Sequence, residues 1–195
     1  MKISPSQAAA HESDYAFARS RLGSPPRTTL LHIGEHDTVV LTGSGAGPDA
    51  TLTLALGSRR TAAAFFRHDP PTPLELETAI ETVEVEVSRV RGLPIDGAVL
   101  ASSDAAVYEL AAVGAPPGSS MQVMALATVE SLFQRLASAS LGHPSALKGM
   151  PGGREAAAVL LILREFMHHL GFEAISVIDG PEDWPGLDAD STTRT

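Results

Sequence analysis

One short stretch of the sequence gathers side chains that could bind a metal ion or surround a phosphate group. The stretch LLHIGEHDTVV, residues 30–40, predicts a strand, a tight turn and a second strand. Its candidate metal ligands are His32, Glu35, His36 and Asp37. Because His32 and His36 stand on either side of the turn, and side chains alternate faces along a strand, a solvated turn is favoured over a metal site.

Two other stretches carry groups with chemical potential. Ser102 and Ser103 offer hydroxyl groups before Asp104, but no histidine stands at a predictable position to activate them, so a helix N-cap is favoured over a nucleophile. GMPGGRE, residues 149–155, leads into a helix, and the free N–H groups of a helix start can hold an anion. The residues of this candidate anion site are Gly152, Gly153 and Arg154.

Composition excludes several classes of protein. The 195 residues carry a net charge of −9 without a basic block, which disfavours a nucleic-acid partner. The chain has no cysteine, which rules out disulfides and thiolate chemistry and agrees with a cytoplasmic location. The longest apolar run, AAAVLLIL, is far below the roughly 20 residues of a membrane span, and the first 20 residues lack a signal-peptide core.

The elements that must position these residues are strands first and helices later. Three short β-rich runs separated by Gly, Pro and Asp predict an antiparallel meander, with GSGAGP as a hairpin loop. Thr72, Pro73 and Glu75 form the pattern of a helix N-terminus with a capping box. The expected helices cover residues 4–22, 58–69, 73–91, 104–113, 126–139 and 154–170. Further strands are expected at 96–102, 121–125 and 173–179.

Several segments together resemble the exopolyphosphatase and guanosine pentaphosphate phosphohydrolase (Ppx/GppA) family, within the actin-like ATPase and sugar kinase superfamily. ISPSQAAAHESDYAFARSRLG resembles the family's opening helix of the second half. LALGSRRTAAAFFRHDPPTPLELETAIETVEVEV resembles its Leu-Gly-Ser strand end and proline-marked long helix. LFQRLASASLGHPSALKGMPGGREAAAVLLILREFMHHLGFEAISVID resembles its closing loop, helix and strand.

The resemblance implies an α/β fold: a single ribonuclease-H-like lobe, with a mixed sheet made of a three-strand meander and later parallel strands, and helices packed on the sheet. The expected domains are an N-terminal helix and linker over residues 1–27, the lobe over 28–180, and a disordered tail over 181–195. The family's first half, which carries another phosphate turn and the carboxylate that activates water, is expected to be absent.

The same resemblance places the family's second phosphate turn on the 30–40 stretch. The family pattern Asp-Ile-Gly-Gly-Gly-Ser falls on His32, Ile33, Gly34, Glu35, His36 and Asp37, with Thr38 offering a hydroxyl one place later. Glycines let backbone N–H groups approach phosphate, whereas Glu35 and Asp37 would each repel it by roughly 4 kcal/mol at about 4 Å and a dielectric near 20.

Two further family motifs are also altered. The family's Gly-Gly-Thr turn falls near Asp104, Ala105 and Ala106, and its glycines are gone. In the closing segment Arg154 matches the family's arginine, whereas the acid two places later has become Ala156.

These changes favour a catalytically silent half-domain that serves as a binding or regulatory module, with no cofactor. The alternative is a phosphoanhydride hydrolase whose site is completed by a homodimer or a separate first lobe, and only this alternative calls for Mg²⁺. In either case the expected partners are a second copy or a partner lobe, and a phosphate-containing small ligand. Nucleic acid and membrane are not expected partners.

Overall fold

The structure is a computed structural model that describes residues 5–113 and 121–179, and its strands form a single mixed sheet. The strands are β1 (Thr28–Ile33), β2 (Thr38–Gly43), β3 (Ala50–Leu54), β4 (Val99–Ser102), β5 (Met121–Ala125) and β6 (Ala174–Ile178). Their order across the sheet is β3-β2-β1-β4-β6-β5. The predicted meander and the predicted strand at 121–125 are therefore both present.

The sheet changes character at β1. On one side β1, β2 and β3 pair antiparallel, with Ile33 opposite Thr38 where the first hairpin turns. On the other side β1, β4 and β6 run parallel, and β5 closes the edge antiparallel to β6. Because the carboxyl ends of parallel strands meet at one edge of a sheet, the residues after β1 and after β4 lie close together.

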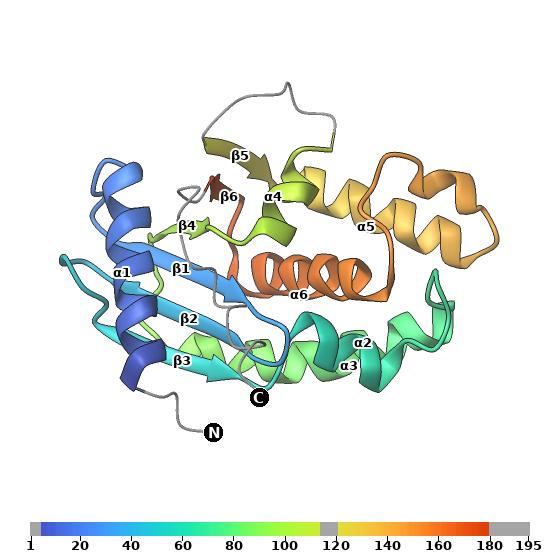
Figure 1. Cartoon of the computed structure of the whole chain (residues 1–195), viewed down its shortest axis with the longest axis horizontal. Coiled ribbons are helices and arrows are strands. Elements are labelled where there is room, and N and C mark those ends of the chain that lie inside the picture. Colours follow the sequence, from blue (N-terminus) through green and yellow to red (C-terminus); the bar gives the residue numbers. More distant parts are fainter. Residues whose placement is uncertain (1–4, 114–120, 180–195) are drawn as a thin grey trace, which may run out of the picture.

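Helices cover both faces of the sheet (Figure 1). The helical elements are α1 (Pro5–Arg21), α2 (Ser58–Phe65), α3 (Pro73–Ser88), η1 (Arg89–Gly92), α4 (Ala105–Ala111), α5 (Leu126–Ser140), η2 (Pro144–Leu147) and α6 (Arg154–Leu170). Helix α1 lies across the meander on one face, whereas α3, α5 and α6 build the main core on the other.

Two hydrophobic cores of different size result from this layering. The larger joins one face of the sheet to α6, whose residues Leu161, Ile162 and Leu163 are fully buried. The smaller lies under α1, where Tyr15 and Ala18 are fully buried against the opposite face. The α5 residues predicted to share an apolar face, Val129, Leu132, Phe133 and Leu136, all point into the larger core.

The predicted start of α3 is confirmed in detail. The Thr72 N–H donates to the Glu75 carboxylate at 2.8 Å, and the Glu75 N–H donates to the Thr72 hydroxyl at 3.3 Å, with Pro73 at the first helical position. Partial burial of the Glu75 carboxyl favours its neutral form, but the hydrogen bonds from Thr72, His68 and the Arg67 N–H outweigh it and hold the pKa at about 2.

The ends of three predicted helices are corrected by the structure. Helix α2 ends at Phe65, because Phe66 adopts an extended conformation, rather than running to Asp69. Helix α3 ends at Ser88 and continues as the η1 turn, rather than running to Arg91. Helix α4 covers only Ala105–Ala111, because Asp104 is its N-cap in an extended conformation and Ala112 is its C-cap. The predicted tail at 181–195 lies outside the described residues. No helix within the described ranges combines the length and apolar character that crossing a membrane requires.

Candidate functional site

The turn between β1 and β2 is a closed four-residue loop. The Gly34 N–H donates to the Asp37 carbonyl at 3.0 Å, directly beyond the paired residues Ile33 and Thr38. The predicted strand, turn and strand are thus confirmed. One N–H group that a phosphate turn would present to its ligand is already used inside the turn.

The start of α2 packs directly onto this turn. The Ser58 N–H donates to the Gly34 carbonyl at 2.9 Å, and the N–H groups of Arg59 and Arg60 donate to the Glu35 carbonyl at 2.9 and 3.0 Å. A Cβ atom placed on Gly57 would lie 2.5 Å from the Glu35 carbonyl oxygen. Only glycine at position 57 therefore allows the two backbones to come this close.

The acids of the turn have cationic partners, which reduce the repulsion of phosphate expected from Glu35 and Asp37. The Glu35 carboxylate lies 2.8 Å from the Arg59 guanidinium, and the Asp37 carboxylate lies 3.4 Å from that of Arg60. The Arg60 Nε also donates to the His36 carbonyl at 2.6 Å. The Arg59 guanidinium also lies 3.6 Å from the Glu155 carboxylate, so the two arginines offset the charges of Glu35 and Asp37 only in part.

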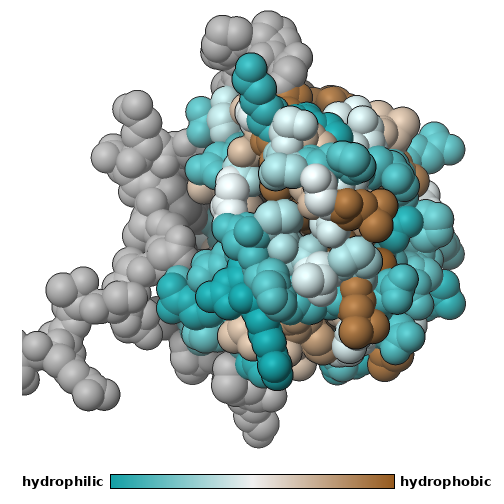
Figure 2. Space-filling view, turned by 90° about the vertical axis from the view of Figure 1, so that its right-hand side faces the viewer, coloured by the Kyte–Doolittle hydropathy of each residue, from teal (hydrophilic) through white to brown (hydrophobic). Residues whose placement is uncertain are grey.

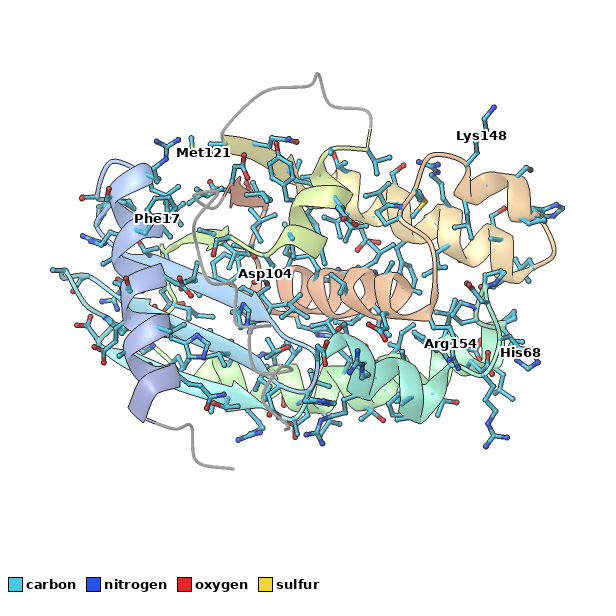
Figure 3. The ribbon with its side chains drawn as sticks, viewed as in Figure 1. Phe17, His68, Asp104, Met121, Lys148 and Arg154 are labelled. Atoms are coloured by element: carbon cyan, nitrogen blue, oxygen red, sulfur yellow. The ribbon has the colours of Figure 1, made fainter. Side chains whose placement is uncertain are left out.

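A carboxylate from α4's start occupies the inner side of the turn. Asp104 Oδ2 accepts from the Ile33 N–H at 2.7 Å, and Asp104 Oδ1 lies 2.5 Å from His32 Nδ1. The parallel pairing of β1 with β4 brings these residues together from 71 and 72 positions apart. Figure 3 shows Asp104 above the end of β1. The altered Gly-Gly-Thr turn around Asp104 thus supplies an internal anion to the β1–β2 turn.

The predicted N-cap role of Ser102 and Ser103 is wrong. Asp104 takes the N-cap position of α4, and its carboxylate makes no capping bond because it is turned toward β1. Ser102 is fully buried, and its hydroxyl accepts from the Asp104 N–H at 3.2 Å. Ser103 is only partly exposed. Ser102 therefore helps to orient Asp104.

Thr38 does not offer its hydroxyl to a ligand in this structure. Its exposed fraction is 0%, and its Oγ1 is buried without a hydrogen-bond partner among the described residues. Along β2, Thr38 alternates with Val39 and points with Val40 toward the larger core. The Thr38 hydroxyl, which the resemblance offers to a ligand, therefore points into the core instead.

A histidine that the sequence analysis passed over completes the cluster. His11 of α1 is 6% exposed, and its ring centroid lies 5.4 Å from that of His32. Burial, then the neighbouring His32, lower the pKa of His11 to about 4, although the charge of Asp104 opposes this shift. The sequence did contain a sign that His11 is buried, namely its spacing. His11, Tyr15 and Ala18 follow the i, i+4, i+7 pattern of the face that α1 buries.

The second predicted anion site lies elsewhere. Arg154 starts α6, but its NH1 donates to the Phe66 carbonyl at the end of α2, at 2.9 Å. Figure 3 places Arg154 beside His68, away from Asp104. Gly152 and Gly153 are exposed, and Cβ atoms placed on them would meet nothing within 4 Å. Arg154 therefore ties two helices together rather than pointing at the open glycines.

The face that includes the start of α6 is mainly hydrophilic, with separate apolar spots (Figure 2). A small pocket near these glycines is lined mainly by apolar side chains, among them Leu110, Leu136 and Leu160. Asp69 is the acidic residue of its lining. An acid beside a mostly apolar lining does not favour a phosphate.

Known structures share this fold. The Aquifex aeolicus member of the Ppx/GppA protein family superposes with a TM-score of 0.71 at 20% identity, over 91% of this chain and 59% of that chain. An exopolyphosphatase from Cytophaga hutchinsonii superposes with a TM-score of 0.63 at 16% identity, over 88% of this chain and 60% of that chain. No family model and no curated protein matches the sequence.

The predicted fold class is thereby confirmed: a mixed sheet of meander and parallel strands with helices packed on it, as in the actin-like ATPase fold of these structures. The chain spans about 60% of the length of the solved structures that it matches.

Proposed function

We propose that the protein is a Ppx/GppA-like half-domain that does not cleave phosphoanhydrides by itself and serves as a binding or regulatory module. The observation that carries the proposal is the Asp104 carboxylate, which accepts from the Ile33 N–H at 2.7 Å and lies 2.5 Å from His32 Nδ1. An anion that the chain itself supplies is bound to the inner side of the β1–β2 turn.

The competition with an external phosphate can be put in physical terms. A phosphate that used the Ile33 N–H would first displace a hydrogen bond to a charged acceptor, which contributes about 1.5–3 kcal/mol. If Asp104 stayed nearby, at about 4 Å and a dielectric near 20, the repulsion would be roughly 4 kcal/mol. The Gly34 N–H and the Thr38 hydroxyl are also withheld, the first by the Asp37 carbonyl and the second by burial. Tight phosphate binding at this turn is therefore disfavoured.

A module of this kind acts through a partner. We propose that this partner is a second copy of this chain or a separate first lobe. The solved structures are longer than this chain, which covers 59–62% of each of them. A cytoplasmic location, the lack of a resident cofactor and a phosphate-containing small ligand bound jointly with the partner belong to the same proposal.

The second candidate is a hydrolase, requiring Mg²⁺, whose site is completed by pairing. The ion pairs of Glu35 with Arg59 and of Asp37 with Arg60 favour it, because they offset part of the negative charge that the turn would otherwise present. This candidate requires that pairing also moves Asp104 away from Ile33.

Phosphate release separates the two candidates. The protein is incubated with Mg²⁺ and polyphosphate, guanosine pentaphosphate or a nucleoside triphosphate, over a hundredfold range of protein concentration, while light scattering gives its mass. The silent module predicts release at the rate without protein at every concentration. Release that rises more steeply than protein concentration, together with a dimer mass, would establish the paired hydrolase instead; a monomer at every concentration would exclude self-pairing.

A further inference from the structure

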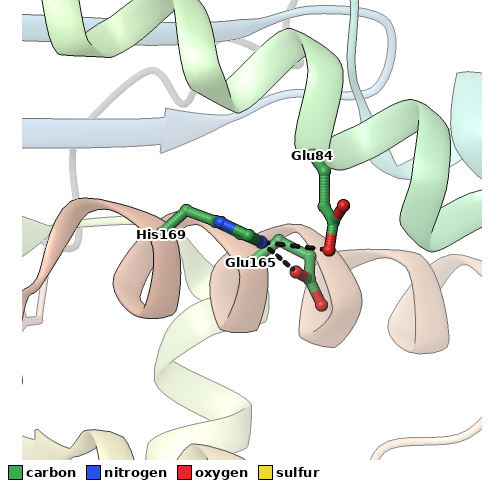
Figure 4. Close-up of side chains that lie close together, drawn as sticks. All are labelled: Glu84, Glu165 and His169. Carbon is green, nitrogen blue, oxygen red and sulfur yellow. Dashed lines mark hydrogen bonds and ion pairs between the residues drawn. The ribbon is translucent and has the colours of Figure 1, made fainter.

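A second polar cluster lies between α3 and α6, remote from the β1–β2 turn. Glu84 comes from α3, and Glu165 and His169 come from α6, where they are four residues apart on one face. His169 Nε2 lies 3.1 Å from Glu84 Oε1 and 3.1 Å from Glu165 Oε2 (Figure 4). The three ligand atoms all lie within 4.8 Å of one another.

The unusual member of this cluster is Glu165, whose side chain is only 1% exposed. A buried carboxylate requires partners for both of its oxygens. Arg164 NH1 donates to Oε1, and the same guanidinium also contacts Glu130 and lies over the Phe133 ring. Oε2 is on the other side and faces His169.

Carboxylates outnumber guanidinium groups around the cluster. Glu84, Glu130 and Glu165 supply three negative charges, and Arg164 supplies one positive charge. His168 lies 3.6 Å from Glu130, and the Arg91 guanidinium bonds the His169 backbone carbonyl at 3.3 Å rather than either carboxylate. The space between Glu84 Oε1 and Glu165 Oε2 is thus electrostatically suited to a cation.

We propose that Glu84, Glu165 and His169 bind one divalent transition-metal cation of the Zn²⁺ type, through one carboxylate oxygen each and His169 Nε2. Ligands about 2.0–2.1 Å from zinc in tetrahedral geometry lie about 3.3–3.4 Å apart. Two of the three separations are close to this value, at 3.1 Å, and the third, between the two carboxylate oxygens, is within 4.8 Å. Glu84 and His169 are partly exposed, so an ion can enter and a water molecule can take the fourth position. The metal would join α3 to α6, independently of what the β1–β2 turn does.

The direct test is titration of chelator-treated protein with Zn²⁺ by calorimetry, and with Co²⁺ by visible absorption. We expect one ion per chain and a Co²⁺ spectrum of low coordination number. Glu84→Gln and His169→Gln should each weaken binding by about 10–100-fold or more, since each removes a ligand. Zn²⁺ at a hundredfold excess over its Kd should raise the Tm of the wild type by about 5–10 °C.

His168→Gln is the matched control, because His168 is the adjacent histidine and faces Glu130 instead. It should bind Zn²⁺ as the wild type does. Glu84 is partly exposed, so Glu84→Gln keeps the test valid even if His169→Gln fails to fold, as circular dichroism would reveal. The proposal is overturned if the wild type binds no ion, or if Glu84→Gln binds Zn²⁺ as tightly as the wild type, which would indicate adventitious binding by exposed histidines.

Discussion

The β1–β2 turn and the start of α6 look alike in sequence but differ in the structure. Both place glycines beside charged residues where an anion could bind. The turn is enclosed by α2 and Asp104, which use its backbone groups. The start of α6 is open: Gly152 and Gly153 have free space around them, and Arg154 is attached to α2. Glycine is required beside the turn, at position 57, by close packing between segments, and at the start of α6 only position 153 requires it, through its positive φ of 90°.

The largest expected effect is a substitution that separates the turn from α2. Gly57→Ala would place a methyl group 2.5 Å from the Glu35 carbonyl, and backbone on both sides prevents relief. We expect a loss of at least about 3 kcal/mol in the free energy of unfolding, measured with urea.

Gly152→Ala is the control at the start of α6. Nothing lies within 4 Å of the added methyl group, and we expect a change within about 0.5 kcal/mol. Equal losses in the two variants would show that the two regions are not packed differently.

Removing the internal anion should have the next largest effect. Asp104→Ala leaves the Ile33 N–H and the His32 ring without their acceptor, for an expected loss of about 2–3 kcal/mol. Arg154→Ala removes a more exposed bond to Phe66 and should lose about 1 kcal/mol. Thermal and urea unfolding of both variants give the comparison; a smaller loss for Asp104→Ala than for Arg154→Ala would contradict it.

Lowering the pH should reduce the free energy of unfolding, because the buried His11 beside the turn must become protonated. Its pKa is about 4 in the folded protein and 6.5 in the unfolded chain, so the unfolded chain binds more protons between these values. The stabilisation is therefore complete above pH 6.5 and is lost as the pH falls toward 4, by about 1–2 kcal/mol between pH 7 and pH 5. The stabilisation from Glu75, whose pKa is lowered from 4.5 to about 2, is lost only at still lower pH.

Urea midpoints across this pH range test the assignment to His11. His11→Leu should flatten the dependence between pH 7 and pH 5, whereas His143→Gln, at an exposed histidine, should leave it unchanged. A dependence that survives His11→Leu would place the titrating group elsewhere.

The smallest effects are expected at the ion pairs on the rim of the turn. Arg59 and Arg60 are about half exposed, so each of Arg59→Gln and Arg60→Gln should change stability by about 0.5 kcal/mol or less. Their effect should appear instead in the surface charge, as a shift in the isoelectric point. A loss above 2 kcal/mol for either would mean that the ion pairs, and not the backbone packing, hold the turn.

Local patterns in the sequence were sufficient for much of the fold. Thr72 and Glu75 marked the start of α3 because a capping box needs only neighbouring residues. The three β-rich runs of residues 28–54, separated by Gly, Pro and Asp, predicted the meander for the same reason. The lengths of the predicted helices were less accurate, since the ends of α3 and α4 depend on the rest of the fold and not on neighbouring residues alone.

The site could be predicted only in part. His32 and Asp104 were both selected, but their contact depends on the parallel pairing of β1 with β4. The ion pairs of Arg59 and Arg60 depend on where α2 packs, which the composition of SRR does not reveal. For the same reason Ser102 and Ser103 were taken for the cap of α4, whereas Asp104 takes the N-cap position and turns its carboxylate toward β1.

The most direct test of the account follows the backbone amides of Ile33 and Gly34 by NMR while inorganic phosphate or pyrophosphate is added. Because Asp104 and the Asp37 carbonyl already accept from these groups, both amide signals should stay in place up to millimolar ligand in the wild-type protein. Saturable shifts at Ile33 and Gly34 in the micromolar range would contradict the account, since they would place an external anion where the internal one is described.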